Sequence, residues 1–294
     1  MKAMITGNLT IDFVENTYRI GGSGFYGGRA LSEGFNVETY VLTNIDKNYR
    51  SSIINTMNSH GIKVLEIESE TMPIFIISKG KAREFKGSSP KISNYFIEKY
   101  VKLLNPEIVI LAPIMRELDI NSIVFIEQKF KGILSVDIQG FVRSIKNSEI
   151  LCEWDKDLEK NLTLANIVHG NINEFCFKSS ETQILKKMSN LSSICKTLFL
   201  VSLDQRGTYA IYKGEIFYIP SLNIVPIDDV GAGDILLAIT SYYVAKGENV
   251  LQATIKGVIA ASLKVGNACT KWFNKEDVES KYSEHTGKIK VVTL

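Results

Sequence analysis

The sequence predicts an α/β protein built on a doubly wound, mostly parallel β-sheet flanked by helices. Short runs rich in Ile, Val and Leu alternate with longer amphipathic segments along the 294 residues, as in proteins made of strand–helix–strand units. Several of the runs are apolar almost without interruption, which is typical of parallel strands buried on both faces. No repeat or linker divides the chain, so we expect one domain over residues 1–294.

The expected elements follow one another from the N-terminus. The helix candidate at 94–106 stops at Asn105-Pro106, because the residue before a proline disfavours helical geometry. A second helix candidate lies at 48–61, and two long helices are expected at 232–246 and 249–265, with Gly247 between them. The strand candidates are residues 2–7, 36–45, 61–68, 107–113, 132–138, 164–170 and 197–203.

Two segments, about 11–20 and 72–87, interrupt this alternation. The second reads as two strands joined by a short polar turn, which is a hairpin. Long insertions in α/β proteins are often functional, which favours a small accessory β-sheet acting as a lid or a dimer surface over an edge decoration. We therefore expect lid strands in both segments and a homodimer formed through them.

Composition restricts the class of partner. The formal net charge is +2, so no general attraction to nucleic acid or to a membrane surface is expected. The sequence shows no secretory signal and no apolar run long enough to span a bilayer. Its four cysteines form no C-x-x-C pair, which predicts free thiols in a reducing cytoplasm; they are Cys152, Cys176, Cys195 and Cys269.

A glycine-rich turn at 228–234, D-D-V-G-A-G-D, opens the expected helix at 232–246. The first N–H groups of a helix have no partner within it, and with the helix dipole they attract anions such as phosphate. Asp234 lies within one turn of that anion site. A carboxylate there is either a helix-start charge or a base that accepts a proton from a hydroxyl attacking phosphorus.

The turn resembles the D-T-x-G-A-G-D signature of the ribokinase/PfkB family of sugar and nucleoside kinases, which have a ribokinase-like α/β fold. The resemblance implies that Asp234 is the catalytic base and that the amides of Gly231, Ala232 and Gly233 form an anion hole. Asp229 stands where the family usually has Thr. A monovalent cation, K⁺, near Asp228 is also implied by resemblance.

Further short matches follow in the family's order. G-N-L-T-I-D at 7–12 implies that Asp12 binds substrate hydroxyls. The segment 21–35 resembles the Gly-Gly substrate motif, which places Gly22 and Tyr26 at the substrate; many members have Asn where this chain has Tyr26. N-x-x-E at 171–174 implies that Asn171 and Glu174 organise Mg²⁺, with Glu174 acting through water.

The nucleotide-binding residues are also implied by resemblance. V-S-L-D-Q-R-G at 201–207 resembles the family's V-T-L-G-x-x-G turn, so Ser202, Asp204 and Gly207 are expected at the nucleotide. The segment 265–270 is expected to line the adenine pocket, with Asn267 among its contacts. ATP and Mg²⁺ are the implied cofactors.

The segment 135–145 bears on the acceptor. Asp137 and Gln139 can hydrogen-bond hydroxyls, and Arg143 can contact the substrate or the transferring phosphoryl group, although a solvated arginine is an equally simple interpretation. The pattern resembles D-x-Q-x-x-x-R in carbohydrate and myo-inositol kinases, which favours a sugar or polyol. Nucleosides stay open, with Tyr26 or Phe25 available to stack on a base.

Several alternatives accompany this interpretation. Asn171 and Glu174 can be a helix-capping pair, and Asp12 a turn residue. G-S-G-F-Y-G at 22–27 fits the dinucleotide pattern, with Asp46 downstream, although it does not directly follow the first strand. The hypothesis is an ATP-dependent kinase; a non-catalytic sugar or nucleotide sensor and an NAD-dependent oxidoreductase are the rivals. The histidines, His60, His169 and His285, are expected in core or surface roles.

Overall fold

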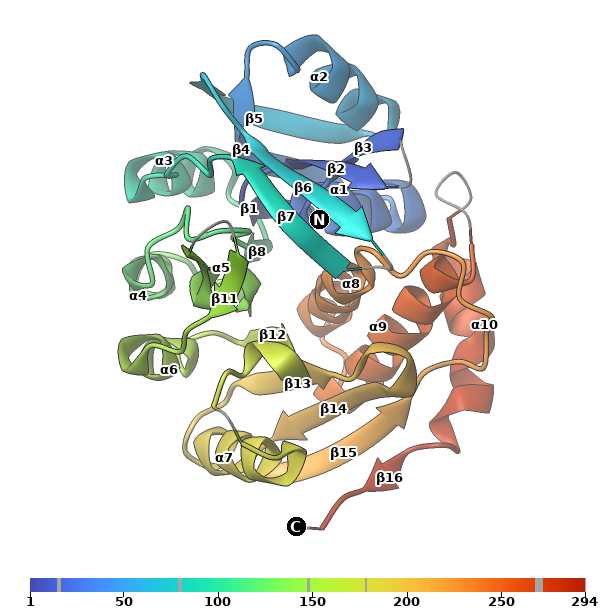
Figure 1. Cartoon of the computed structure of the whole chain (residues 1–294). Helices are drawn as coiled ribbons and strands as arrows, with labels where there is room; N and C mark the ends of the chain where they lie inside the picture. The colour runs from blue at the N-terminus through green and yellow to red at the C-terminus, as the bar shows by residue number, and fades with distance from the viewer. Residues whose placement is uncertain (15–16, 79–80, 147–148, 178, 268–271, 294) are drawn as a thin grey trace.

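A computed structural model describes residues 1–14, 17–78, 81–146, 149–177, 179–267 and 272–293. A ten-stranded sheet forms the centre of the molecule (Figure 1). From one edge to the other its strands are β5 (Ile62–Ser69), β4 (Glu38–Asp46), β1 (Lys2–Thr6), β8 (Ile108–Leu111), β9 (Ile133–Asp137), β12 (Ile167–Asn171), β13 (Leu198–Ser202), β14 (Gly207–Tyr212), β15 (Glu215–Pro220) and β16 (Lys290–Val291).

The seven strands from β5 to β13 pair in parallel, and β14, β15 and β16 add antiparallel neighbours at one edge. The chain builds outward from β1 in one direction through β4 and β5. It then returns to β8 on the other side of β1 and continues through β9, β12 and β13. The doubly wound, mostly parallel sheet expected from the sequence is confirmed, and the seven expected strands are the seven parallel ones.

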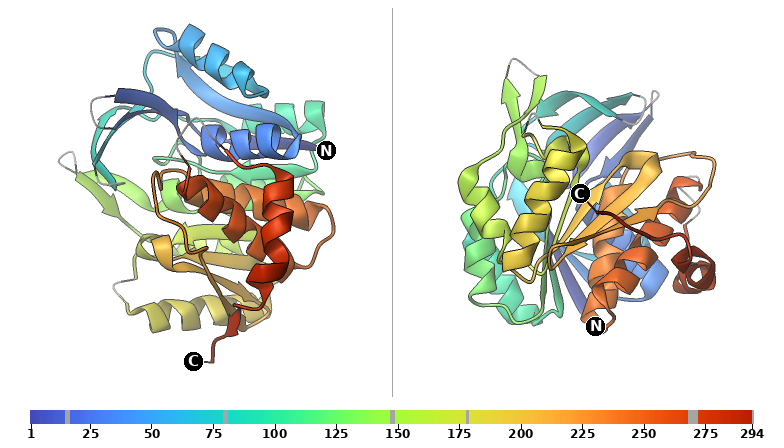
Figure 2. Two further views of the ribbon diagram at one scale, coloured as in Figure 1. Left: turned by 90° about the vertical axis from the view of Figure 1, so that its right-hand side faces the viewer. Right: turned by 90° about the horizontal axis from the view of Figure 1, so that it is seen from below.

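Two helical layers cover the sheet (Figure 2). Successive residues of a strand face opposite layers: Met4 packs into one hydrophobic cluster, while Ala3 and Ile5 pack into the other. The layer around Met4 contains α3 (Asn94–Leu104), α4 (Asn121–Glu127), α6 (Lys156–Leu162) and α7 (Glu181–Ile194). The opposite layer contains α1 (Ser23–Arg29), α2 (Arg50–Ser59), α8 (Ala232–Ala245), α9 (Val250–Val265) and α10 (Lys275–Thr286).

A small separate sheet lies beside the main one, in the order β3-β2-β6-β7. Its strands are β2 (Thr10–Val14), β3 (Thr17–Gly21), β6 (Pro73–Ser78) and β7 (Lys81–Gly87). The expected accessory sheet is confirmed, and both predicted segments contribute to it. A hairpin of β10 (Arg143–Lys146) and β11 (Glu149–Cys152) packs against this sheet, where Ile150 contacts a cluster containing Phe75 and Phe85.

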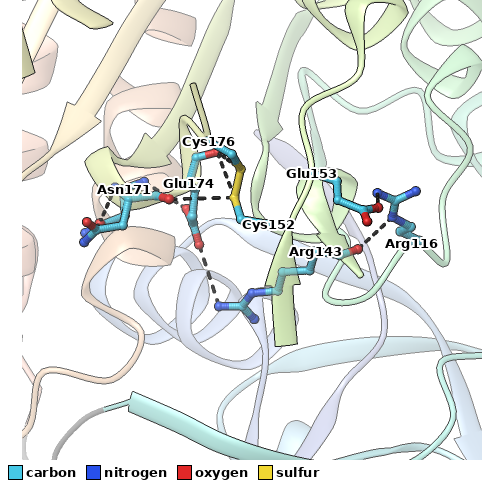
Figure 3. Close-up of a disulfide and its surroundings, with 8 residues drawn as sticks. Arg116, Arg143, Cys152, Glu153, Asn171, Glu174 and Cys176 are labelled. Atoms are coloured by element: carbon cyan, nitrogen blue, oxygen red, sulfur yellow. Dashed lines mark hydrogen bonds and ion pairs between the residues drawn. A yellow bond between two sulfur atoms is a disulfide. The ribbon is translucent and has the colours of Figure 1, made fainter. Parts of the chain in front are cut away.

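The expectation of four free thiols is wrong for one pair. Cys152, at the end of β11, forms a disulfide with Cys176, and their Cα atoms lie 5.8 Å apart (Figure 3). No local pattern could indicate this bridge, because the pair is 24 residues apart and meets only when the hairpin folds back on the segment after β12. The disulfide also removes the cysteine argument for a reducing compartment. Cys195 is free and half-buried, and Cys269 lies outside the described residues.

Candidate active site

A pocket of about 330 Å³ opens at the carboxyl ends of the parallel strands. Asp137, Asn171 and Ser202 line it, and each is the last residue of its strand, β9, β12 or β13. Ligands of doubly wound sheets bind at this edge. The accessory sheet contributes Asp12 and Phe75 to the same pocket, so the expected lid strands do border the candidate site.

The start of α8 forms one wall of the pocket. Gly231, Ala232 and Gly233 all line it, and Gly231 has a φ of 81°, the left-handed conformation that favours glycine. A Cβ on Gly231 would lie 2.1 Å from the ring of Tyr26. Tyr26 borders the pocket as predicted, but its buried ring lies against this turn, so its contact is with the anion site itself.

Asp234 lines the pocket one residue beyond that turn and is half-buried. The Ser23 hydroxyl, at the start of α1, donates a hydrogen bond to its carboxylate. Burial and the nearby charge of Asp137 raise the pKa of Asp234, the Ser23 hydrogen bond opposes them, and the net result is a pKa of about 7. A carboxylate with a pKa near neutrality is a suitable general base.

His169 was expected in the core or on the surface, but it lies in the pocket. Its Nδ1 is 2.7 Å from Oδ2 of Asp137, and its Nε2 is 3.2 Å from Oγ of Ser202. Burial by itself lowers the pKa of His169, but the Asp137 carboxylate outweighs burial, and the net shift is upward. The ring also packs under the anion turn, since a Cβ on Gly233 would lie 2.7 Å from it.

Asn171 and Glu174 form the capping box that the structural alternative predicted. The Asn171 N–H donates to Oε2 of Glu174 over 2.9 Å (Figure 3). Both side chains nevertheless line the pocket, and Oε1 of Glu174 lies 3.7 Å from Nη2 of Arg143. Burial raises the pKa of Glu174, with Arg143 opposing it. The disulfide anchors this corner, because Cys152 pairs with Arg143 across the hairpin and Cys176 follows Glu174 by two residues.

Asp12 projects from the accessory sheet into the pocket, buried beside Thr10, whose hydroxyl donates to its Oδ1 over 2.6 Å. Burial raises the pKa of Asp12 to about 6, while the Thr10 hydrogen bond and the charges of Arg19 and Arg143 lower it. The remaining predicted substrate residues, Gly22, Gln139 and Arg143, line the same pocket.

The other half of the pocket is largely apolar. Ser202, Asp204 and Gly207, which were expected at the nucleotide, line the pocket, and Asp204 adopts a left-handed φ of 52° where the family pattern has Gly. Asn267 was expected at the adenine pocket, but it is not among the described residues that line the pocket. Its side-chain amide donates instead to the Leu263 carbonyl at the end of α9. The segment 268–270 lies outside the described residues. The apolar lining, which the sequence did not reveal, is Leu222, Ile224, Pro226, Val258, Ala261 and Val265.

Asp228 does not fit the expected cation site. Arg19 of β3 donates to both of its carboxylate oxygens, at 3.0 and 3.1 Å, and Lys264 of α9 donates over 2.9 Å. Burial would raise the pKa of Asp228, but these two cations hold it well below its usual range. Asp229, in contrast, is exposed at the mouth of the pocket.

The glycine pattern at 22–27 follows β3 of the accessory sheet and not the first strand of the main one. A dinucleotide-binding turn lies directly after a strand of the main sheet, so this geometry counts against the oxidoreductase alternative. Within the described part of the chain, no three His, Cys, Asp or Glu side chains group closely enough to hold a metal by themselves, and no helix is long and apolar enough to cross a membrane.

Comparison with known proteins agrees with this geometry. The model of the pfkB family of carbohydrate kinases matches residues 136–271. A bifunctional protein HldE from a Nitratiruptor species is 28% identical over 189 residues, which cover 60% of this chain and 38% of that protein.

Solved structures with the same fold include a pyrophosphate-dependent kinase of the ribokinase family, complexed with a pyrophosphate analogue and myo-inositol. It has a TM-score of 0.78 at 18% identity, with 95% of this chain and 99% of the other covered. Ribokinase from Thermotoga maritima gives a TM-score of 0.74 at 17% identity over 96% and 99% of the two chains. Phosphofructokinase-2 from Escherichia coli, in complex with potassium, gives 0.74 at 13% over 97% and 100%.

Proposed function

We propose that this chain, of which residues 136–271 match the pfkB family of carbohydrate kinases and which has the fold of ribokinase, transfers the terminal phosphoryl group of ATP to a hydroxyl of a small sugar or polyol, inositol included. The observation that carries the proposal is the placement of Asp234. A half-buried carboxylate with a pKa of about 7 lies beside the N–H groups of a helix start and in one pocket with the hydroxyl-binding candidate Asp12.

In this mechanism the acceptor hydroxyl lies between Asp234 and the phosphate held at Gly231–Gly233. Asp234 takes the hydroxyl proton as the oxygen attacks phosphorus, and the amide groups of the turn stabilise the negative charge on the transferring group. Ser23 orients the Asp234 carboxylate through its hydrogen bond. Asp12 and Gln139 bind other acceptor hydroxyls, and Arg143 lies where it can contact the acceptor or the phosphoryl group.

The donor is the point on which the structural neighbours leave a choice, because one of them is pyrophosphate-dependent. An inorganic polyphosphate has no apolar surface, whereas a purine ring buries two apolar faces. The half of this pocket lined by Leu222, Ile224 and Val258 belongs to the same continuous pocket as the anion turn. That continuity supports a nucleotide donor, with Ser202, Asp204 and Gly207 beside its phosphates and ribose.

Magnesium fits the same corner. Asp137 is a buried carboxylate and Glu174 a half-buried one in a pocket that must also accept a polyphosphate, and partial burial raises the pKa of Glu174 because its charge is poorly solvated. A divalent cation near Asn171 and Glu174, bound largely through water, would offset this negative charge and neutralise the phosphates. Outer-shell binding does not require a cluster of three side-chain ligands.

The acceptor side favours a sugar or polyol over a nucleoside. The aromatic residues considered for base stacking are engaged elsewhere: Tyr26 lies against Gly231, and Phe25 packs edge-on against Tyr26, His60 and Trp272. The groups that remain at the acceptor end are mainly carboxylate, amide and guanidinium. Such groups recognise several hydroxyls by hydrogen bonds.

The accessory sheet would act as a lid that excludes water. A homodimer through its strands, a single domain over the chain and a cytoplasmic location are also part of the proposal. Phe13 and Tyr18, which are exposed aromatic residues of β2 and β3, are the side chains that such a dimer would cover. Light scattering of a Tyr18→Asp variant tests this: a dimer in the wild type and a monomer in the variant are expected.

The test is a matrix of donors and acceptors. ATP, GTP and pyrophosphate are each combined with sugars, polyols and nucleosides, and phosphorylated product is measured. We expect product with ATP and a sugar or polyol. Product formed with pyrophosphate but not with ATP would reject ATP as the donor. Tight acceptor binding without any product would favour the non-catalytic sensor. Binding of NADH would instead support the NAD-dependent oxidoreductase hypothesis.

A pair of variants tests whether the apolar half of the pocket binds the nucleotide part of the donor. Ala261→Phe places a ring in the apolar half of the pocket and is expected to raise the KM for ATP while leaving the acceptor KM unchanged. Gln252→Phe adds the same ring on the exposed face of the same helix and serves as the matched control. Equal ATP kinetics in the two variants would reject the nucleotide subsite.

A further inference from the structure

Lys264 is a lysine buried directly behind the anion turn. Its side chain is 2% exposed and reaches from α9 to the segment 228–231. The ammonium donates to three oxygen atoms there: the Asp228 carboxylate at 2.9 Å, the Asp228 carbonyl at 3.0 Å and the Val230 carbonyl. The three acceptors match the three N–H donors of an ammonium group.

These contacts determine which way the turn's amides point. In a trans peptide the C=O and the following N–H point in opposite directions, and no described peptide bond is cis. The Val230 carbonyl points at Lys264, so the Gly231 N–H points away from it. Gly231 lines the pocket, and we infer that its N–H faces the place where phosphate is expected.

The ammonium also lies beside Asp228, where the family resemblance implied a monovalent cation. Asp228 and the carbonyls around it form a small oxygen cage, and Lys264 fills it with a charge attached to the protein. Arg19 adds a second cation on the other side of Asp228. Two cations therefore contact the Asp228 carboxylate behind the anion turn.

We propose that Lys264 is a positioning residue that does the work of a bound monovalent cation, so that phosphotransfer by this protein requires no added K⁺ or Na⁺. The proposal rests on the proposed function for its activity readout. Its physical content is independent of the acceptor: the ammonium orients the Val230–Gly231 peptide and fixes a positive charge beside the donor phosphates.

The first experiment compares turnover of the wild type in potassium, sodium and tetramethylammonium chloride at equal ionic strength, since tetramethylammonium is too large for the cage. We expect the same kcat in all three salts. Saturable activation by potassium or sodium would overturn the proposal.

The second experiment uses two variants. Lys264→Ala should lose about 100-fold in kcat, the size of effect that a misplacement of about 1 Å can cause, and ammonium or potassium ions should restore part of it while tetramethylammonium does not. Lys264→Met keeps the length of the side chain but not its charge, so it should be equally impaired and show no rescue. Near-normal kcat in Lys264→Met would overturn the proposal.

Lys256 provides the matched control. It lies on the same helix, its side chain is 8% exposed, and it pairs with Glu248 and Glu279 away from the pocket. Lys256→Ala should lower stability without any cation-dependent rescue of turnover. Cation rescue in both lysine variants would mean that the effect is unspecific and would overturn the assignment.

A binding measurement separates failure of this inference from failure of the proposed function. Thermal stabilisation of the wild type by ADP is measured in potassium and in tetramethylammonium chloride. Equal stabilisation in the two salts supports the role of Lys264 in place of a cation, even if no acceptor is ever found. Stabilisation by ADP only in potassium overturns that role. If neither ADP nor pyrophosphate binds in any salt, the turn is not an anion site and the role of Lys264 falls with it.

Discussion

Replacing Asp234 with Asn tests the burial of the proposed base without any substrate. The pKa of Asp234 is about 7 in the folded protein, against about 3.9 in an unfolded chain. Between these values the folded state binds more protons than the unfolded state. The ionised Asp234 therefore lowers the free energy of unfolding as pH rises, and the loss is complete only above pH 7.

The size of the effect follows from the shift. Between the unfolded and the folded pKa, each pH unit lowers the free energy of unfolding by about 1.4 kcal/mol. This full slope applies from pH 5 to about pH 7. Between pH 5 and pH 8 the wild type should therefore lose about 2–3 kcal/mol that Asp234→Asn does not lose. This is a large share of an ordinary folding free energy of about 5–15 kcal/mol.

Urea unfolding of both proteins at pH 5, 6, 7 and 8 measures this difference, and it should grow steadily in favour of the variant. Asp229→Asn is the control, because that carboxylate belongs to the same turn but is exposed. At the same time kcat should fall by a factor of about 10²–10⁴ while ADP still binds. A difference in stability that does not change with pH would refute the argument from burial, and near-normal turnover would refute the role of Asp234 as base.

Three further predictions concern the frame of the site. Cys152→Ser should lower the free energy of unfolding by about 3 kcal/mol, because the bridge spans 24 residues; reductant should bring the wild type to the same value, and a wild type indifferent to reductant would contradict the disulfide. Gly231→Ala should lower the free energy of unfolding by about 2–4 kcal/mol, because the left-handed φ and a clash with the Tyr26 ring combine. Urea unfolding measures this loss, and an unchanged stability would mean that Gly231 does not adopt the left-handed turn described above. Asp12→Asn should raise the acceptor KM at least about tenfold through loss of a charged hydrogen bond, while the KM for ATP stays unchanged. Steady-state kinetics measure both constants, and a rise in the KM for ATP instead would mean that Asp12 contacts the donor.

The sequence was informative where a pattern is local. Continuous apolar runs identified the seven parallel strands, and the glycine turn with the helix after it predicted the anion site at the start of α8. Because strands of a parallel sheet end at one edge, the polar residues at the ends of β9, β12 and β13 could be expected in one pocket. Asp137, Asn171 and Ser202 do meet there.

What depends on tertiary contact could not be read in this way. Lys264 meets Asp228 only because α9 packs along α8, which brings together residues 36 positions apart. His169 gave one weak signal, since it lies two residues before Asn171 on the same strand and so shares its face. Nothing in the spacing of Cys152 and Cys176 indicated a bridge.

The three carboxylates of the glycine turn show how environment decides what a residue can do. Asp228 is held ionised by Arg19 and Lys264, so it serves as a fixed anchor for two cations and cannot act as a base near neutral pH. Asp234 is half-buried next to other acids, so its pKa is raised to about 7 and it can accept a proton.

Asp229 is the departure from the family pattern, and its position explains why it is tolerated. The turn is closed by its backbone, whose carbonyl accepts from the Ala232 N–H over 3.3 Å. The side chain is exposed to water at the pocket mouth, where solvent screens its charge from the anion site. The cations of Arg19 and Lys264 lie behind the same turn, so a negative charge at Asp229 need not prevent phosphate from binding.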